Sequence, residues 1–483
     1  MNSARSAPRA PRDRRGRKRT CRRCRELKQR NRALVQENQA LQARVRQLER
    51  QVEAAERAGK RQAAPFSKGE PSTRPARPGR RAGAEYGVRA RRSIPDHVDE
   101  TVEVALPDRC PECGGVVELR SVADQYQTDI PPVRPQVTHF RIQLGECRGC
   151  GKALRGRHPR QTSTAVGAAA SQLGPQAVAL AAHLNKGLGL SFEKCSEIYD
   201  TAFGIRISRS GLCQALHRLA AATQPTYQAL ISSVREAPVV SPDETGWKVG
   251  GHLQWLWAFA TPELTVYAIQ DGRGFDEAAR VLGATFSGVL IRDGWAPYRR
   301  FEEALHQSCL AHLLRRCRLL IDTSVAGAAR FPHAVRRILL KSFELRERYR
   351  GEEISRHGLA VATGRLEAAM ERLLQGNIHY PANRRFLKHL KVEQSYLFTF
   401  LHELDVEPTN WWSEQAIRPA VVTRKVCGGN RTWAGAITQH VLASVLATCR
   451  KQARSPYPLL REIYCSPQPT LIRFQAAPQL RPP

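Results

Sequence analysis

Leucine recurs every seventh residue within residues 27–58. A seven-residue apolar repeat predicts a helix that pairs along one seam, and four heptads predict a short parallel coiled coil, most simply a dimer. Asparagine at two seam positions would lower stability and fix the register. A solitary amphipathic helix is the alternative. The seam positions are Leu27, Leu34, Leu41 and Leu48, alternating with Asn31, Asn38, Val45 and Val52.

Short apolar runs follow one another between residues 237 and 304, separated by Gly, Pro and charged residues. Such runs predict strands. We expect strands at Ala237–Asp243, Trp255–Ala260 and Leu264–Gln270, a helix at Phe275–Leu282 and a further strand at Gly288–Arg292. This order is that of a ribonuclease H-like α/β fold, in which the first and fourth strands lie side by side.

Two of these strands close on an acidic residue, and a third acidic residue begins a later helix. Asp243 ends the first strand, Asp293 follows the fourth, and Glu414 opens a segment that predicts a helix capped by Ser413. Three such carboxylates can converge on two divalent cations, which clamp the attacking and leaving oxygens of a phosphoryl transfer. Carboxylate ligands suit Mg²⁺. Glu244 is expected to point to the opposite face of its strand.

Residues 172–222 predict three helices, of which the last two span 190–203 and 209–219. Gly204 can end the first of these and Ser208 or Ser210 can cap the second. The spacing matches a helix-turn-helix, and an ordinary helical hairpin inside a larger fold is the alternative. The residues expected to face a DNA groove are Arg209, Ser210, Gln214 and Arg218.

Two Cys-x-x-Cys pairs, each followed by Gly, lie within residues 105–162. Four thiolates in this arrangement predict a zinc ribbon that holds one structural Zn²⁺. Apolar residues alternate between the pairs (Val133, Val137, Phe140, Ile142 and Leu144), as in strands. A redox pair or unliganded thiols are the alternatives. The proposed ligands are Cys110, Cys113, Cys147 and Cys150; Cys21 and Cys24 have no partner pair nearby.

The net charge of the 483-residue chain is +32, and residues 1–92 hold 28 Lys and Arg against 8 Asp and Glu. This concentration of positive charge indicates a polyanion partner, which is most simply DNA. Residues 59–92 are rich in Arg, Pro, Gly and Ala and predict a flexible linker. We find no apolar stretch long enough to span a bilayer and no signal-peptide pattern, so we expect a soluble, cytoplasmic protein.

Residues 305–403 have a strongly helical pattern and are expected to form an insertion. His306, Cys309, His312 and Cys317 offer a second set of metal ligands, but we favour packing and DNA-facing roles for them. Four core tryptophans are expected to pack, and one near the metals could stack on a flipped base. Cations expected around the site to contact DNA are Arg315, Arg316, Arg318, Arg418, Arg424, Lys425 and Arg431, with a solvated face as the alternative.

Several segments in fixed order closely resemble the transposases of the insertion-sequence-66 family, over nearly the whole chain. They are Ser-Pro-Asp-Glu-Thr-Gly-Trp (241–247), Arg-Asp-Gly-Trp-Ala-Pro-Tyr-Arg (292–299), His-Gln-Ser-Cys-Leu-Ala-His-Leu-Leu-Arg-Arg (306–316), Glu-Gln-Ala-Ile-Arg-Pro-Ala-Val-Val-Thr-Arg-Lys-Val (414–426) and Gly-Gly-Asn-Arg-Thr (428–432). The resemblance implies a DDE transposase whose metal-binding triad is Asp243, Asp293 and Glu414. It implies two Mg²⁺ ions, cleavage at the ends of an insertion sequence and joining of the new 3′-hydroxyl to target DNA.

One position departs from the family pattern. The family usually has two successive Asn residues shortly before its Glu, whereas here Asn410 is followed by Trp411 and Trp412. If the second Asn supports the metal site or the helix cap, Trp411 would weaken activity.

The expected chain is multidomain α+β and acts on DNA as at least a dimer, in association with the bacterial nucleoid and possible accessory proteins of the same element. A non-catalytic or domesticated DNA-binding regulator resembling basic-zipper proteins is the alternative. The expected parts are a basic arm (1–26), a coiled coil (27–58), a basic linker (59–104), a zinc ribbon (105–162), a helix-turn-helix region (170–236), a catalytic core (237–304 with 404–426), a helical insertion (305–403) and a C-terminal helical and basic segment (427–483).

Overall fold

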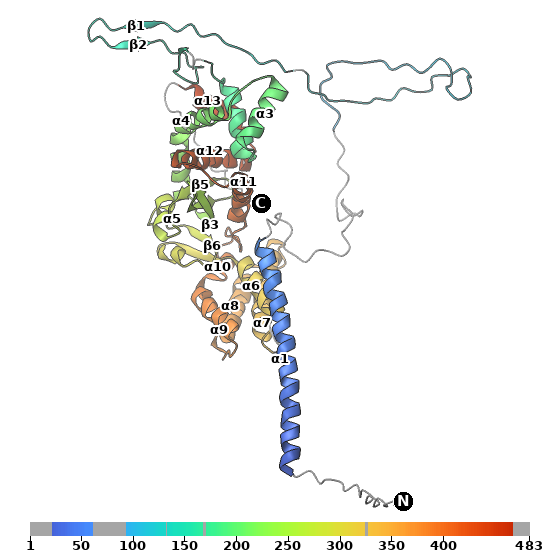
Figure 1. Cartoon of the computed structure of the whole chain (residues 1–483), viewed down its shortest axis with the longest axis vertical. Helices are drawn as coiled ribbons and strands as arrows, with labels where there is room; N and C mark the ends of the chain where they lie inside the picture. Colours follow the sequence, from blue (N-terminus) through green and yellow to red (C-terminus); the bar gives the residue numbers. More distant parts are fainter. Residues whose placement is uncertain (1–21, 61–92, 132, 168–170, 324–326, 467–483) are drawn as a thin grey trace, which may run out of the picture. The chain divides into compact units, whose positions relative to one another are not determined.

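The structure, a computed structural model, describes residues 22–60, 93–131, 133–167, 171–323 and 327–466 (Figure 1). The chain divides into two compact units, Met1–Thr128 and Asp129–Pro483, and each is described by itself. Most of the expected basic arm, including Cys21, and residues 61–92 of the expected linker lie outside the described residues.

The first unit contains α1 (Arg22–Lys60), an unbroken helix of 39 residues that spans the heptad region. The predicted helix is therefore confirmed. In the single chain its four seam leucines are 45–60% exposed. A row of exposed leucines needs a partner to cover it, so the coiled-coil pairing itself stays a prediction. Within the described ranges, no helix is long and apolar enough to cross a membrane.

The second unit begins with an antiparallel hairpin of two short strands, β1 (Leu144–Glu146) and β2 (Ala153–Arg155). Strands were also expected from Val133 to Ile142, but those residues have no regular structure. The expectation was wrong because one face of an alternating segment must be covered, whereas Val133 is 48% and Val137 90% exposed.

A mixed sheet of five strands forms the centre of this unit. The strands are β3 (Val239–Val249), β4 (His252–Ala260), β5 (Thr265–Gln270), β6 (Val289–Arg292) and β7 (Leu305–Ser308). Their order is β5-β4-β3-β6-β7; β3, β4 and β5 are antiparallel, and β6 and β7 run parallel to β3. The expected adjacency of the first and fourth strands is confirmed, and the order is compatible with a ribonuclease H-like core. The strand β7 lies at the start of the segment expected to be helical.

The two faces of the sheet bury different residues. Val240, Trp257 and Phe259 pack in a cluster with α4 (Arg209–Arg235) and α5 (Phe275–Leu282). Trp247 and Val249 pack on the other face with α11 (Trp411–Cys427) and α12 (Trp433–Lys451). Because side chains alternate along a strand, odd-numbered residues of β3 face α11. The helix expected at Phe275–Leu282 is confirmed with the same bounds.

The region expected to form a helix-turn-helix contains α2 (Pro175–Ala182), the π-helical turn η3 (His183–Gly187), α3 (Phe192–Phe203) and α4. Gly204 ends α3 with a left-handed φ of 64°, and the Ser208 hydroxyl accepts a hydrogen bond from the backbone of α4, as expected. The helix α4 continues past the expected end at Leu219, because its apolar spacing persists through Pro225 to Val234. Its buried side is part of the main core, as in the helical-hairpin alternative.

Residues 310–402 form a helical insertion at one end of the sheet (Figure 1). Its core includes Leu339, Met370 and Phe386 and is continuous with Val239 and Ile291 of the sheet. After α11 and α12, the described chain ends with α13 (Pro456–Cys465). The helices of the insertion are α6 (Leu310–Thr323), α7 (Arg330–Arg350), α8 (Arg356–Gln375), α9 (Pro381–Glu393) and α10 (Thr399–His402), with a 3₁₀ turn η5 (Gln394–Tyr396).

A buried ion pair joins the insertion to the sheet. Arg292 at the end of β6 and Glu393 at the end of α9 lie 2.6 Å apart, and both side chains are fully buried. Glu393 also accepts hydrogen bonds from Arg299 at 3.0 Å and from the Ser308 hydroxyl at 2.5 Å. Burial by itself raises the pKa of Glu393, but Arg292 and the hydroxyl outweigh it and hold that pKa below its ordinary value.

Replacing Glu393 with Gln is expected to destabilise the fold by about 3–5 kcal/mol, because it leaves the Arg292 charge buried without its counter-charge. Chemical denaturation followed by circular dichroism measures this loss. Glu353→Gln breaks the exposed pair between Glu353 and Arg348 and serves as the matched control, with a change below about 1 kcal/mol. Equal effects of the two substitutions would contradict the anchoring role of Glu393.

Candidate active site

The register of β3 and β6 sets where the first two acidic residues lie. The last parallel pair joins Val240 to Leu290, and Asp243 and Asp293 each follow three residues later. Equal offsets along parallel strands keep two residues abreast. Asp243 was expected at the end of its strand, but it lies inside β3, opposite Ala258 of β4. What ends near Asp243 is the pairing of β3 with β6, and Asp243 lies just beyond it.

The Asp243 carboxylate lies in a buried and negatively charged environment. Burial raises the pKa of Asp243 to about 7, and the negative charges of Glu244, Asp293 and Glu414 add to this increase. The Asp243 carboxylate accepts one hydrogen bond, from the backbone N–H of Glu244 at 2.9 Å. The group therefore lies in a place where negative charge is costly unless a cation compensates for it.

Asp293 is held in a tight turn after β6. Its Oδ1 accepts a hydrogen bond from the backbone N–H of Trp295 at 2.8 Å. Any side chain at Gly294 would overlap the imidazole of His389 on α9, so the insertion presses directly on this turn. His389 lies 96 residues from Asp293 in sequence, and no local pattern indicates that it belongs to the site.

Glu414 lies in the first turn of α11. Ser413 was expected to cap this helix, but the helix begins at Trp411 and Asn410 occupies the N-cap position without a side-chain cap. The Ser413 hydroxyl donates to the Asn410 carbonyl at 2.9 Å and lies 3.0 Å from the Ser241 hydroxyl. This buried contact fixes the first turn of α11 against β3, two residues from Asp243.

Two residues of α6 hold the Glu414 carboxylate. The Arg315 guanidinium donates to Glu414 Oε1, and His312 Nε2 lies 3.7 Å from the same oxygen. Burial and the charge of Arg315 lower the pKa of His312. Positive charge next to Glu414 is thus supplied by an arginine of the insertion.

The donor set fits a hard divalent cation, although the carboxylates are not gathered around one point. Among the described residues, no three His, Cys, Asp or Glu side chains form a ready-made metal site. The chemistry nevertheless fits, because burial together with nearby carboxylates raises the pKa of Asp243, and Mg²⁺ prefers carboxylate oxygen. Asn410 is 1% exposed, and neither polar atom of its side chain has a hydrogen-bond partner, so its Oδ1 is a further available oxygen.

Glu244 serves the opposite face of β3, as expected. Its carboxylate accepts hydrogen bonds from Arg273 at 2.6 Å and from the Tyr298 hydroxyl at 2.5 Å. The Arg273 guanidinium stacks between the rings of Trp255 and Trp295. This arrangement supports the Asp243 and Asp293 segments from behind, and it gives those two tryptophans a packing role.

The second set of candidate metal ligands does not form a helical face. His306 lies on β7 and not on a helix, with Nε2 3.0 Å from the Phe301 carbonyl. Cys309 and Cys317 are buried, and burial raises the pKa of both thiols. These three residues therefore pack, whereas His312 reaches Glu414.

Most of the residues expected to contact DNA are exposed, although several also contact other residues of the fold. The exposed ones are Arg209, Gln214, Arg315, Arg318, Arg418, Lys425 and Arg431. Of these, Arg209 lies 4.0 Å from Glu193, Arg315 contacts Glu414 and Arg318 lies 3.6 Å from Asp322. The remaining three are more buried: Arg218 donates to Gln172 at 2.8 Å, Arg316 lies 4.9 Å from the Phe386 ring centroid, and Arg424 donates to the Gly246 carbonyl and to Thr245.

Each Cys-x-x-Cys pair forms the same local turn. In the first unit the Cys110 carbonyl accepts from Gly114 N–H at 2.9 Å, and in the second the Cys147 carbonyl accepts from Gly151 N–H at 2.8 Å. Backbone N–H groups of the turn lower the pKa of Cys110 and of Cys147, which favours the thiolate form that binds metal. The two turns lie in different units, so their joint binding of Zn²⁺ stays a prediction.

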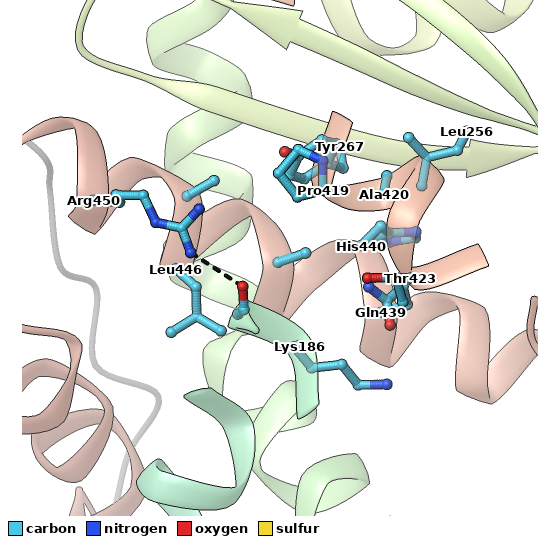
Figure 2. A pocket seen from close by; sticks show the side chains of 13 residues that line it. Lys186, Leu256, Tyr267, Pro419, Ala420, Thr423, Gln439, His440, Leu446 and Arg450 are labelled. Carbon is cyan, nitrogen blue, oxygen red and sulfur yellow. Dashed lines mark hydrogen bonds between the residues drawn. The ribbon is translucent and has the colours of Figure 1, made fainter. Parts of the chain in front are cut away.

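Two cavities among the described residues of the second unit differ in size. One of about 400 Å³ opens beside Asp293 and is lined by His312, Arg316 and His389. The other holds only about 30 Å³ between η3, the sheet, α11 and α12, where Arg450 donates to the Gly187 carbonyl (Figure 2). The second has room for about one water molecule, so the cavity at Asp293 is the larger of these two and could admit a ligand.

Asp243→Asn is expected to stabilise the metal-free protein above neutral pH by on the order of 2 kcal/mol. The raised pKa of Asp243 favours the folded state while the group is protonated, and this stabilisation is lost as the pH rises from its ordinary 3.8 through about 7. Thermal melts in a chelator should therefore fall with pH for the wild type and fall less for the variant. The exposed Asp405→Asn is the control; identical pH slopes for all three proteins would refute the crowding of charge at Asp243.

Comparison with known proteins agrees with this site. The family model described as Transposase IS66 family matches residues 170–438, which include all three carboxylates. An uncharacterized protein of Sinorhizobium fredii is 24% identical over 406 residues, covering 76% of this chain and 72% of its own length. Because the family model spans more than half of the chain, the protein belongs to the IS66 family of transposases.

Proposed function

We propose that the protein is a DDE transposase that cleaves DNA at the ends of an insertion sequence and transfers the freed strand to a target. The observation that carries this proposal is the placement of Asp243 and Asp293 abreast at one edge of the sheet, with the first turn of α11, which contains Glu414, held against β3 by the Ser241–Ser413 contact. Burial raises the pKa of Asp243 to about 7, and the charges of Glu244, Asp293 and Glu414 add to this increase. A carboxylate kept under this repulsion disfavours the fold, and a metal-dependent reaction accounts for its presence.

Asp243, Asp293 and Glu414 would hold two Mg²⁺ ions, with Asn410 as a further oxygen donor. When bound, such ions lower the pKa of a water nucleophile and stabilise the charge on the leaving oxygen. For Glu414 to join them, its carboxylate must leave Arg315. The released guanidinium could then bind a DNA phosphate. Arg315 would thus pair with the Glu414 carboxylate when DNA is absent and with a phosphate when DNA is bound.

The rest of the chain supports binding to DNA. The excess of 20 positive charges in residues 1–92 would attract the phosphate backbone, and the exposed Arg209, Gln214, Arg418, Lys425 and Arg431 would add contacts near the core. The two cysteine turns would together hold one structural Zn²⁺. The helix α1 would pair with that of a second protomer and bring two DNA ends to one assembly.

Asp293→Ala is expected to abolish Mg²⁺-dependent nicking and strand transfer on DNA that carries the element's own ends, while binding to those ends persists. The reason is that the substitution removes a metal ligand and leaves the basic surface intact. Gel assays of cleavage and of binding measure the two properties separately. Asp271→Ala removes an exposed carboxylate next to the sheet and should leave both unchanged.

Equal cleavage by wild type and Asp293→Ala would refute the triad. End binding without cleavage by the wild type, with or without the element's accessory proteins, would favour a non-catalytic DNA-binding regulator.

Replacing Leu34 and Leu41 together with Glu is expected to convert the protein to a monomer, because it places charge in the middle of the α1 seam. Analytical ultracentrifugation measures the change. Gln36→Glu with Gln47→Glu adds the same charge on the outer side of the helix and should leave the dimer intact. A wild type that sediments as a monomer would exclude pairing through α1.

A further inference from the structure

Two of the seven tryptophans are half exposed, and each begins a helix. Trp411 is the first residue of α11 and is 49% exposed, and Trp433 is the first residue of α12 and is 47% exposed. In contrast, Trp247 and Trp257 are fully buried, and their indole N–H groups donate to protein oxygens. Trp411 and Trp433 are therefore accessible to an outside partner.

The exposed side of α11 continues from Trp411 as an apolar stripe. Val422 is 44% and Val426 55% exposed, and they follow Trp411 by 11 and 15 residues, which places them on the same side of a helix with 3.6 residues per turn. Ile437, one turn after Trp433, is 47% exposed. We call these exposed side chains of α11 and of the beginning of α12 the α11 face: Trp411, Arg418, Val422, Val426, Trp433 and Ile437.

Beyond Glu414, which pairs with Arg315, the residues of α11 and α12 carry only positive charge. Residues 415–461 contain eight Lys and Arg residues and no Asp or Glu. Arg418 projects from the stripe itself, and Lys425 and Arg431 are exposed beside it. A second copy of the chain docking by a twofold axis would bring these like charges together, whereas a nucleic acid would neutralise them.

We propose that the α11 face binds unpaired nucleotides of the DNA next to the cleavage site, with Trp411 stacking on a base. This inference rests on the proposed function and names the form of its substrate. A paired duplex buries its base faces, so only an unpaired base offers a ring to an indole, while the phosphates contact the cations. Trp411 lies three residues before Glu414, so the stacked base would adjoin the phosphodiester that is cut.

The two adjacent tryptophans at the beginning of α11 have different surroundings. Trp412 packs against both neighbouring cores, whereas Trp411 is 49% exposed. Trp411 can therefore contact DNA while Trp412 keeps the beginning of α11 in place.

The test compares binding of the full-length protein to two DNA probes in a chelator, where no cleavage occurs. One probe is a fully paired duplex, and the other is the same duplex with an unpaired fluorescent adenine analogue. Trp411→Ala is expected to weaken binding to the unpaired probe about tenfold and to relieve quenching of the analogue, without changing duplex binding. Trp411→Phe should retain most of both properties.

Three further variants keep the result interpretable. Trp433→Ala should weaken binding to the probe with the unpaired base and leave duplex binding unchanged, which tests the α11 face even if Trp411→Ala fails to fold. Arg418→Ala should weaken binding to both probes and make that binding less dependent on salt concentration. Tyr380→Ala removes an aromatic ring that is 41% exposed in the insertion, and it should change neither probe.

An equal loss on both probes, or no loss with either tryptophan variant, would overturn the inference while leaving the proposed function standing. So would dissociation of a dimer by Trp411→Ala with unchanged DNA binding, because the face would then join two protomers. A wild type that binds neither probe would overturn the proposed function as well.

Discussion

The parallel pairing of β3 with β6 is the constraint on which the candidate site depends. Only two residue pairs join these strands, Val239 with Val289 and Val240 with Leu290. Because the chain leaves this ladder at the same level on both strands, Asp243 and Asp293 emerge abreast. The buried contact between Ser241 and Ser413 then brings the first turn of α11, and with it Glu414, to the same edge.

Crowding of carboxylates at this edge opposes folding, and the surrounding structure is arranged to limit that cost. Arg315 neutralises Glu414 on the side of the insertion, and Arg273 neutralises Glu244 behind the strand. Among the described residues no cation pairs with Asp243, and its pKa rises to about 7, while burial also raises the pKa of Glu244 despite Arg273. Asp243, which has acidic neighbours in β3, after β6 and in α11, therefore carries negative charge that no cation in the described part of the chain balances. A divalent ion bound at Asp243 would remove most of this unfavourable electrostatic energy.

Local patterns predicted much of this architecture. The helix at Phe275–Leu282, the glycine end of α3, the Ser208 cap and the order of the first four strands followed from side-chain period and turn chemistry. The placement of Glu244 on the opposite face of β3 from Asp243 followed from the alternation of side chains along a strand. Where the pattern was short or depended on distant partners, prediction failed: β7 has four residues, α4 runs through Pro225 because the core covers it, and Val133 to Ile142 have no covering layer.

The contacts around the acidic edge were beyond local inference for the same reason. His389, Glu393 and Asn410 carry no motif of their own, and they join the site only because α9 and the start of α11 fold back onto the ends of β6 and β7. The expected capping by Ser413 failed because Ser241 offered its hydroxyl a partner 172 residues away in sequence.

The packing of His389 against Gly294 also bears on how such proteins can be recombined in the laboratory. The insertion is encoded as a continuous block between β7 and α11, and it invites exchange between relatives as a cassette. Yet Glu393 of this block neutralises Arg292, and the His389 imidazole fills the space left by the missing side chain of Gly294. A chimera must therefore take both surfaces of this junction from the same parent.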